Sequence, residues 1–248
     1  MKRLLIAGAL AFAAAGQALA ADLPAPAPPP QAPAAYVPTV APVYNWGGIY
    51  FGANGGYAFG NSEWSDPNNP VTPNTGDFST TGFLVGPTVG VNFQTDAFVF
   101  GIEGDFDASW LDGKTSNAYC GAAIGFPGGQ CETKNTWLGT VRGRIGYAAD
   151  RVLFYATAGG AFGNIDTGVN GGFVKSTKAG WTAGAGVEVA FADNWTARVE
   201  YLFVDLQNAT CNAADPCGVN FLTTGLPANQ TVKFDANLIR LGVDYKFR

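Results

Sequence analysis

The stretch LIRLGVDYKFR, from Leu238 to Arg248, has an apolar side chain at every second residue from Ile239 to Phe247, with small or polar residues between them. A period of two residues predicts a β-strand that is buried on one face. The stretch alone leaves open whether the apolar face lies against a protein core or against lipid. Its apolar residues are Ile239, Leu241, Val243, Tyr245 and Phe247.

The first twenty residues, MKRLLIAGALAFAAAGQALA, have the three parts of a secretory signal peptide. Lys2 and Arg3 precede an apolar run that is too short for an ordinary transmembrane helix. The run leads to the A-x-A site formed by Ala18 and Ala20, so we expect residues 1–20 to be removed and Ala21 to begin the mature chain. The sequence therefore predicts an exported protein, with a buried or membrane-anchored helix as the alternative.

The composition favours one domain that binds no nucleic acid. Charged residues are only 13% of the 248 residues, against a usual share of about a quarter. Two of the 14 basic residues lie in the signal peptide, so the mature chain has 12 basic and 19 acidic residues and a net charge of −7. Such a chain is a poor candidate for binding phosphates of nucleic acid. No later segment approaches the run of ~20 apolar residues that a spanning helix needs.

All four cysteines lie beyond the predicted signal peptide. An even number in an oxidising compartment predicts two disulfides, for which three pairings are open. We favour Cys120–Cys131 and Cys211–Cys217, because each pair falls within one turn-rich segment. A zinc site is the weaker alternative, since neither pair has C-x-x-C spacing and the chain contains no histidine.

Residues 21–45 have a different texture from the rest of the chain. They contain the proline-rich run LPAPAPPPQAPAAYVPTVAPVY, which has neither a helical nor a strand period. This composition predicts an extended, semi-rigid spacer, with a plain disordered tail as the alternative.

Residues 46–248 contain eight segments in which apolar residues recur at every second position. In most of them one face is continuously apolar, while the opposite face carries glycines, polar residues or charges. In the fifth segment, VLFYATAGGAFG, the pattern does not decide which of the two faces is the apolar one. The predicted strands are residues 48–60, 81–94, 98–110, 136–147, 152–163, 180–191, 195–206 and 238–248.

Connections between these segments alternate in length. Short ones are expected at residues 95–97, 149–151 and 192–194, and long ones at residues 61–79, 111–135, 164–178 and 207–232. This layout is typical of an outer-membrane barrel, and the segment lengths suit tilted transmembrane strands. A soluble barrel would place its apolar residues inside. The large apolar face favours lipid outside, so we predict an all-β, eight-stranded, antiparallel, up-and-down transmembrane β-barrel.

The end of the chain resembles the C-terminal assembly signal of bacterial outer-membrane barrels. Arg240, Gly242, Tyr245 and Phe247 supply the polar residue, the glycine and the two spaced hydrophobic residues of that signal. The resemblance implies that the barrel-assembly machinery reads these residues during insertion. The usual signal ends on its aromatic residue, whereas this chain adds Arg248.

Three stretches resemble the small outer-membrane β-barrel, porin-like family of alphaproteobacteria, which includes major surface antigens and haemin-binding members. They are ADLP at Ala21–Pro24, WGGIYFGANGGYAFG at Trp46–Gly60, and RVEYLFVDL together with LIRLGVDYKF near the end. The resemblance implies a barrel in the lipid of the bacterial outer membrane. An even number of strands would place both termini in the periplasm.

Inward-facing charges are expected to form a network in the lumen. A barrel of eight strands is just wide enough to be filled by its own side chains, and confined charges should pair. We favour a salt-bridged plug over a charged constriction that selects ions. The predicted network consists of Glu103, Asp105, Asp107, Arg142, Arg144, Glu188, Arg198, Glu200, Arg240 and Asp244.

Three functional hypotheses follow, and none is enzymatic. Barrel hydrolases and acyltransferases of the outer membrane use a serine with a histidine, and this chain contains no histidine. The first is an envelope and surface protein whose exposed loops contact a host or another extracellular ligand. The second is a narrow pore for ions or small solutes. The third is a loop-level binder of haemin, with Tyr119 or Cys120 as the axial ligand. We predict no bound cofactor or metal, and the oligomeric state is open.

Overall fold

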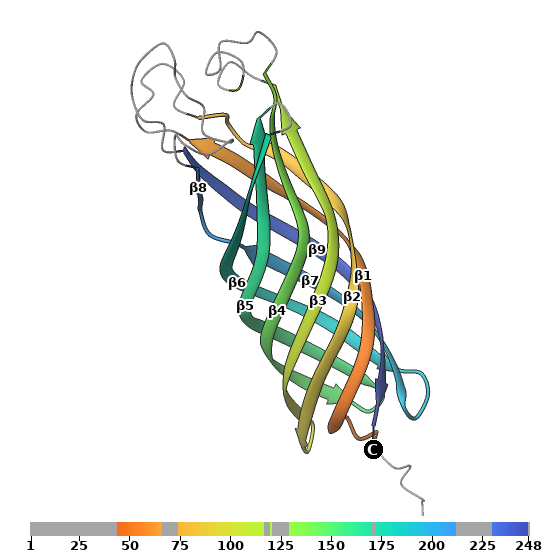
Figure 1. The fold of residues 1–248 in the computed structure, drawn as a ribbon. Coiled ribbons are helices and arrows are strands. Elements are labelled where there is room, and N and C mark those ends of the chain that lie inside the picture. The colour runs from red at the N-terminus through yellow and green to blue at the C-terminus, as the bar shows by residue number, and fades with distance from the viewer. Residues whose placement is uncertain are drawn as a thin grey trace, which may run out of the picture. The chain divides into compact units, whose positions relative to one another are not determined.

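The computed structural model describes residues 44–65, 74–116, 120, 129–169, 172–211 and 230–247. Most of these residues lie in antiparallel strands (Figure 1). No helix in the described residues is long and apolar enough to cross a membrane. The strands are β1 Gly48–Ser65, β2 Phe78–Thr95, β3 Phe98–Thr115, β4 Cys131–Ala149, β5 Val152–Val169, β6 Gly172–Ala190, β7 Trp195–Asp205, β8 Ala209–Cys211 and β9 Gln230–Lys246.

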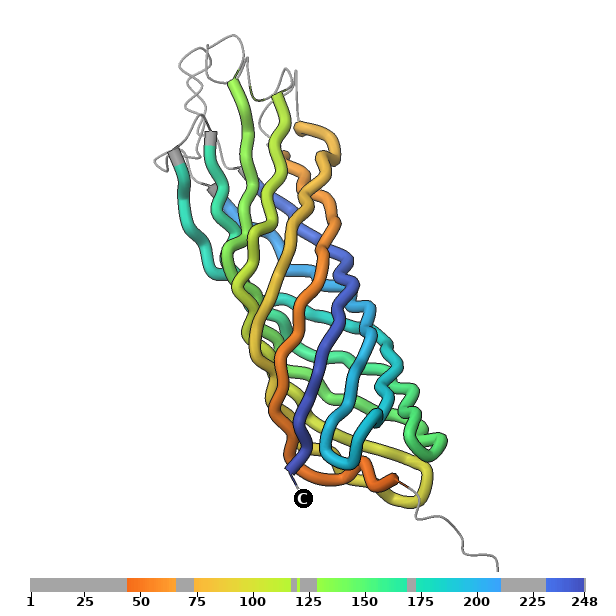
Figure 2. Tube along the Cα trace, turned by 90° about the vertical axis from the view of Figure 1, so that its right-hand side faces the viewer, coloured from red at the N-terminus to blue at the C-terminus, as the bar shows by residue number. Residues whose placement is uncertain are grey.

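Each long strand pairs with the next one along the barrel, and β9 returns to pair with β1. The closing pair runs from Tyr50 opposite Lys246 to Ser65 opposite Thr231. Figure 2 shows β1 in orange beside β9 in dark blue. The predicted antiparallel, eight-stranded barrel is therefore confirmed.

The short strand β8 is a continuation of β7 rather than a ninth wall strand. β7 pairs with β9 as far as Asp205 opposite Asp235, and β8 resumes the pairing at Ala209 opposite Val232. Residues 206–208 therefore face only residues 233–234, which is the geometry of a β-bulge. Gln207 in this bulge has a positive φ of 43°.

Tight turns close one end of the barrel, and we call this end the turn side. β2 and β3 are joined by Asp96 and Ala97, and β4 and β5 by Asp150 and Arg151. Asp96 and Asp150 have φ values of 54° and 51°, a left-handed conformation that aspartate tolerates better than most residues. These turns lie where the sequence predicts short connections.

The predicted long connection at residues 164–178 is wrong. β5 continues to Val169 and β6 begins at Gly172, so the connection consists of Asn170 and Gly171 alone. Asn-Gly between two strands is a strong signal for a tight hairpin. The hydrophobic alternation is weak on both sides of this pair, which is why a loop was predicted here.

Every long strand except β7 is longer than predicted, mainly through added residues at the end opposite the turn side. The long strands other than β7 contain 17 to 19 residues, whereas a tilted strand needs about 9–11 residues to cross a membrane. Each wall strand therefore has a lower section near the turns and an upper section beyond it. Much of the chain that was predicted to form loops belongs to the upper section.

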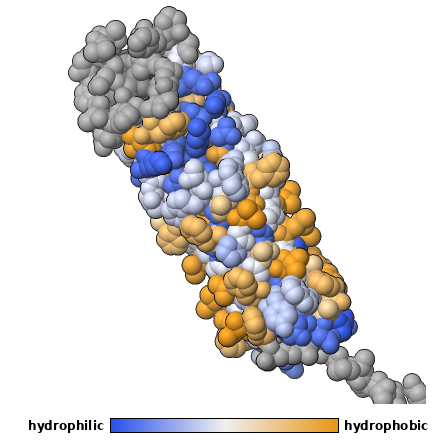
Figure 3. Space-filling model, turned by 45° about the vertical axis from the view of Figure 1, so that its right-hand side comes forward, coloured by the Kyte–Doolittle hydropathy of each residue, from blue (hydrophilic) through white to orange (hydrophobic). Residues whose placement is uncertain are grey.

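The two sections have opposite polarity, as β9 shows. In the lower section Leu241 and Val243 point outward, while Arg240 and Asp244 point into the barrel. In the upper section Lys233 is exposed on the outside, while Phe234 and Leu238 are buried inside. Figure 3 shows the same change on the outer surface, with hydrophobic side chains gathered over the lower section and hydrophilic ones above them.

The lower section therefore has the polarity of a membrane barrel, and the upper section has the polarity of a soluble barrel. The outward-facing apolar side chains of the lower section form a band that we call the belt. On the outer wall above the belt, Lys114 and Lys134 pair with Glu132 at 3.1 and 2.9 Å. The inside of the upper section is an apolar cluster, the upper core, which includes Trp64, Phe78, Leu84, Leu111, Ile165, Leu202, Val204, Leu206, Val232, Phe234 and Leu238.

One predicted disulfide is confirmed. Cys120 and Cys131 are bonded, with 5.6 Å between their Cα atoms, and both are buried against the upper core. The bond ties the β3–β4 connection to the first residue of β4. The second predicted pair cannot be placed, because Cys217 lies outside the described residues.

Candidate functional site in the barrel lumen

The structure places all ten residues of the predicted network inside the lower section, and each is buried. Strand register explains their proximity, because Glu103 lies opposite Arg142, Glu200 opposite Arg240, and Glu188 opposite Arg198. Alternation along each strand turns these side chains to the same side of the wall.

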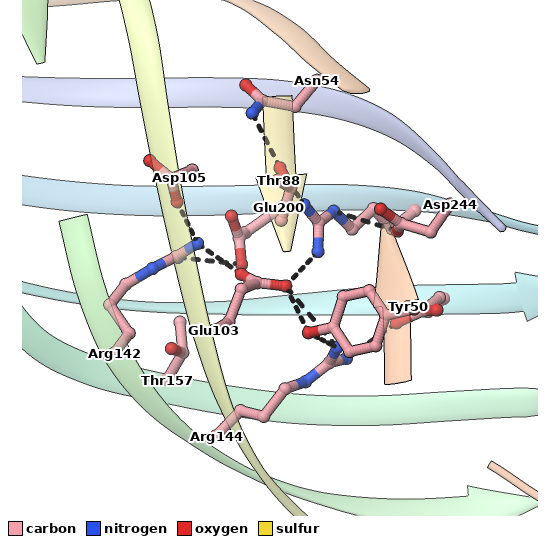
Figure 4. Close-up of polar contacts among 12 residues, drawn as sticks. Tyr50, Asn54, Thr88, Glu103, Asp105, Arg142, Arg144, Thr157, Glu200 and Asp244 are labelled. Atoms are coloured by element: carbon pink, nitrogen blue, oxygen red, sulfur yellow. Dashed lines mark hydrogen bonds and ion pairs between the residues drawn. The ribbon is translucent and has the colours of Figure 1, made fainter. Parts of the chain in front are cut away.

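Glu103 on β3 is the centre of the network (Figure 4). Its Oε1 accepts a hydrogen bond from Arg142 Nη2 at 2.5 Å. Its Oε2 accepts from Arg198 Nη1 and from the hydroxyl of Tyr50, the latter at 2.7 Å. Arg144 Nη1 lies 3.7 Å from the same oxygen. One carboxylate therefore faces three guanidinium groups that come from two strands.

Arg240 on β9 pairs with two carboxylates of β3 across the lumen and with Glu200 on the neighbouring strand β7. Its Nη1 lies 3.0 Å from Asp107 Oδ2 and 3.1 Å from Asp105 Oδ1, and its Nη2 lies 2.6 Å from Glu200 Oε2. Arg142 Nη1 also reaches Glu200, at 3.1 Å from Oε1. Because β3 is not a neighbour of β9, and β4 is not a neighbour of β7, the pairs of Arg240 with Asp105 and Asp107 and the pair of Arg142 with Glu200 cross the lumen.

Glu188 does not pair with Arg198, its expected neighbour in the strand register. Its Oε2 lies 2.7 Å from Arg144 Nη2, while Arg198 turns toward Glu103 and lies 3.6 Å from Asp244. Gly242 makes room for this arrangement, because a Cβ there would lie 2.7 Å from Arg198 Nε. Glycine in the predicted assembly signal therefore also has a packing role in the lumen.

Hydroxyl groups complete the network, and they were not among the predicted site residues. Tyr155 donates to Glu200 at 3.1 Å, Thr140 to Asp105 at 2.8 Å, and Thr196 to Glu188 at 2.6 Å. Arg144 also stacks over the ring of Tyr155, with 4.0 Å between its guanidinium carbon and the ring centre. These residues occupy the same alternating positions as the charges, which was the signal available in the sequence.

The turn side of the lumen is covered by the chain that precedes β1. The indole of Trp46 is buried and donates from Nε1 to the carbonyl of Asp150 at 2.9 Å. Its backbone N–H donates to Gln94 Oε1 at 2.6 Å, and Lys246 donates to the carbonyl of Asn45. Trp46 also belongs to a cluster of buried hydrophobic side chains at this end, which we call the turn-side plug. Its members are Tyr44, Trp46, Val99, Ala148, Leu153, Tyr155 and Ala190.

The chemistry of the network fits a fixed structure better than a reactive site. Arginine stays charged at all ordinary pH values, and four arginines here face six carboxylates. The described residues contain no group of three or more His, Cys, Asp or Glu side chains that holds a metal ion. Strong pairing on several sides leaves each guanidinium little freedom to move.

The remaining predicted residues are placed as follows. Arg240 and Gly242 of the predicted assembly signal face the lumen, while Tyr245 and Phe247 face outward. The ring of Tyr245 packs against Trp195, with 5.1 Å between the ring centres. Of the haemin-ligand candidates, Cys120 is bonded to Cys131, and Tyr119 lies outside the described residues.

Comparisons with known proteins agree with this architecture. Residues 6–247 match the family model described as outer membrane protein beta-barrel domain. The 31 kDa outer-membrane immunogenic protein of Brucella melitensis is 36% identical over 227 residues, covering 85% of this chain and 88% of that protein. The 25 kDa outer-membrane immunogenic protein of Brucella canis is 32% identical over 249 residues, covering 100% and 99%. The 22 kDa outer membrane protein of Rhizobium leguminosarum is 32% identical over 251 residues, covering 99% and 100%.

Proposed function

The chain belongs to the outer membrane protein beta-barrel family, and from this premise we propose that it is a closed, non-enzymatic anchor that displays its longer connections at the cell surface. The names of two relatives describe them as immunogenic outer-membrane proteins, which supports a surface role.

The observation that carries the proposal is the filled lumen. Ion pairs of Glu103 and Arg240 cross the lower section between the turn-side plug and the upper core. A solute passing through the lumen would have to separate these paired charges. The side chains of both partners are only 0–2% exposed. Breaking a buried pair by removing one partner costs about 3–5 kcal/mol, so an open lumen is disfavoured.

We also propose that the turn side faces the periplasm. Outer-membrane barrels have short periplasmic turns and longer extracellular loops. All connections at the turn side are short, whereas at the opposite end only β5 and β6 are joined by a tight hairpin and the other three connections are longer. The chain before β1 and the end of β9 lie at the turn side, where Phe247 N donates to the carbonyl of Ile49. The upper section, with its polar outer wall, would then project from the membrane toward the medium.

Insertion by the barrel-assembly machinery is part of the same proposal. Tyr245 and Phe247 present aromatic side chains on the outer surface of the closing strand, where a partner reaches them. The signal peptide, the spacer at residues 21–45 and this assembly signal are all expected from the sequence alone. The absence of histidine from the whole chain supports a non-enzymatic role.

Intact-cell labelling tests the display of the surface connections. A short epitope inserted within residues 66–73, between β1 and β2, should be bound by an antibody on unbroken cells. The same epitope inserted between Asp96 and Ala97 is the matched control, because that turn lies at the opposite end of the barrel. It should be detected only after the outer membrane is made permeable.

The opposite pattern, with the turn epitope accessible on intact cells, would contradict the proposed orientation. Equal labelling of both epitopes on intact cells would contradict it as well. In both variants, heat-modifiable migration in a gel should establish that the barrel has folded.

A further inference from the structure

The outer wall of the lower section is not uniformly bulky. A shallow, open groove of about 680 Å³ indents it from Phe98 on β3 to Tyr201 on β7. Small residues form its floor at Ala156, Ala185 and Gly186, and larger ones form its sides at Phe154 and Tyr201. Phe154 and Tyr201 are about half exposed, so the groove opens to the lipid side of the wall.

The groove continues along the wall in the direction away from the turn. A second recess of about 420 Å³ is also lined by Ile145 and Ala156, and extends to Ala158 and Gly143. On β4 and β5 the two recesses together form an apolar track along the strands, from Tyr147 to Gly143 and from Phe154 to Ala158. Four residue steps of extended strand span about 13 Å, so this track accommodates part of a hydrocarbon chain.

A charged pair lies at the turn end of the groove. Arg151 precedes Phe154 by three residues in the sequence. Its Nη2 lies 3.4 Å from Oδ1 of Asp193, which is on the β6–β7 connection. Both side chains are exposed, at 49% and 72%. Three residues of extended strand span about 10 Å, so a cation and a carboxylate stand just beyond the apolar track.

We propose that this groove is a binding site for a zwitterionic glycerophospholipid of the periplasmic leaflet. An acyl chain lies over Ala156 and Ala185, the phosphate meets Arg151, and the headgroup ammonium meets Asp193. The belt already faces lipid, so the site is a recessed part of that interface. The neighbouring carboxylates Asp150 and Asp193 disfavour a purely anionic headgroup. The inference rests on the proposed orientation, in which the turn side faces the periplasm.

Native mass spectrometry of the full-length protein tests the site. The protein is folded into vesicles of phosphatidylethanolamine and phosphatidylglycerol in equal amounts, then extracted in mild detergent. Wild-type barrels should retain phosphatidylethanolamine in preference to phosphatidylglycerol. Ala156→Leu combined with Ala185→Leu fills the floor and should lower the retained fraction about tenfold. Asp193→Asn should remove the preference between the two headgroups, because only phosphatidylethanolamine carries the ammonium that Asp193 meets, whereas both lipids carry the phosphate.

Ala53→Leu is the matched control, because Ala53 faces lipid on β1 outside the groove and its change should leave retention unaltered. Equal retention in wild type and in the groove-filled variant would overturn the proposal. The proposal would also be overturned if the wild type formed dimers that carry no lipid and the groove-filled variant did not. That result would assign the groove to a second copy of the chain. Heat-modifiable migration of each variant, and the epitope test above, separate these outcomes from failure to fold or from a reversed orientation.

Discussion

Glu103 receives more guanidinium contacts than any other described carboxylate of the lumen, and it has no solvent to replace them. Changing it to glutamine keeps its size but leaves Arg142, Arg144 and Arg198 short of one negative charge. We predict that Glu103→Gln lowers the free energy of unfolding by about 3–5 kcal/mol. Urea titration of the protein in phospholipid vesicles, followed by tryptophan fluorescence, measures this change.

Glu63→Gln is the control for that experiment. Glu63 also faces a cation, but this pair lies on the outer wall. Lys233 Nζ is 3.8 Å from Glu63 Oε2, and the side chain of Lys233 is 61% exposed. An exposed pair contributes about 0–1 kcal/mol, so this variant should unfold almost like the wild type. If the two variants lost the same stability, the lumen network would not be the buried structure described above.

At the scale of single residues, alternation predicted which side of the wall each charge faces, because that depends only on position along a strand. It did not predict partners such as Arg142 with Glu200, which meet across the lumen. Those contacts depend on barrel closure and strand tilt, which bring non-neighbouring strands together. The sequence offered no measure of either.

At the scale of a strand, the boundary between Leu238 and Ile239 on β9 separates two environments. We predict that Val243→Arg, in the belt, lowers the free energy of unfolding by about 2–4 kcal/mol, as expected for a cation near the middle of a bilayer. Thr81→Arg, outward on β2 above the belt, should change it by less than about 0.5 kcal/mol. Urea unfolding from vesicles compares the two.

Equal costs for these two substitutions would contradict the placement of the membrane boundary. A large cost for Thr81→Arg alone would reverse it, and would assign the upper section to the membrane.

The strand cores were predictable because their apolar faces are continuous and their period is two. The upper sections were not, since inward positions there become apolar while outward ones become charged. A search for one apolar face therefore ends each strand too early, as at Phe59 on β1 and Trp110 on β3. The hairpin at Asn170-Gly171 did carry a local turn signal, but its flanking strands lacked a clear apolar face.

At the scale of the whole barrel, three layers fill the lumen in sequence. The turn-side plug lies lowest, the ion-pair network lies above it, and the upper core lies highest. Fold and family followed from the sequence, and the ion-pair layer was expected from its charges. The turn-side plug was missed, because Tyr44 and Asn45 were assigned to the proline-rich spacer. The contacts of Trp46 with the β2–β3 and β4–β5 turns become visible only once the barrel has closed.

Single-channel conductance in a planar bilayer tests the closed lumen most directly. We predict that the refolded protein gives no conductance steps, and that Glu103→Gln stays silent because the layers above and below the network remain. Heat-modifiable migration must show that the same preparation is folded. Reproducible steps in the wild type, with an amplitude that changes in Glu103→Gln, would contradict the account and establish a charged pore.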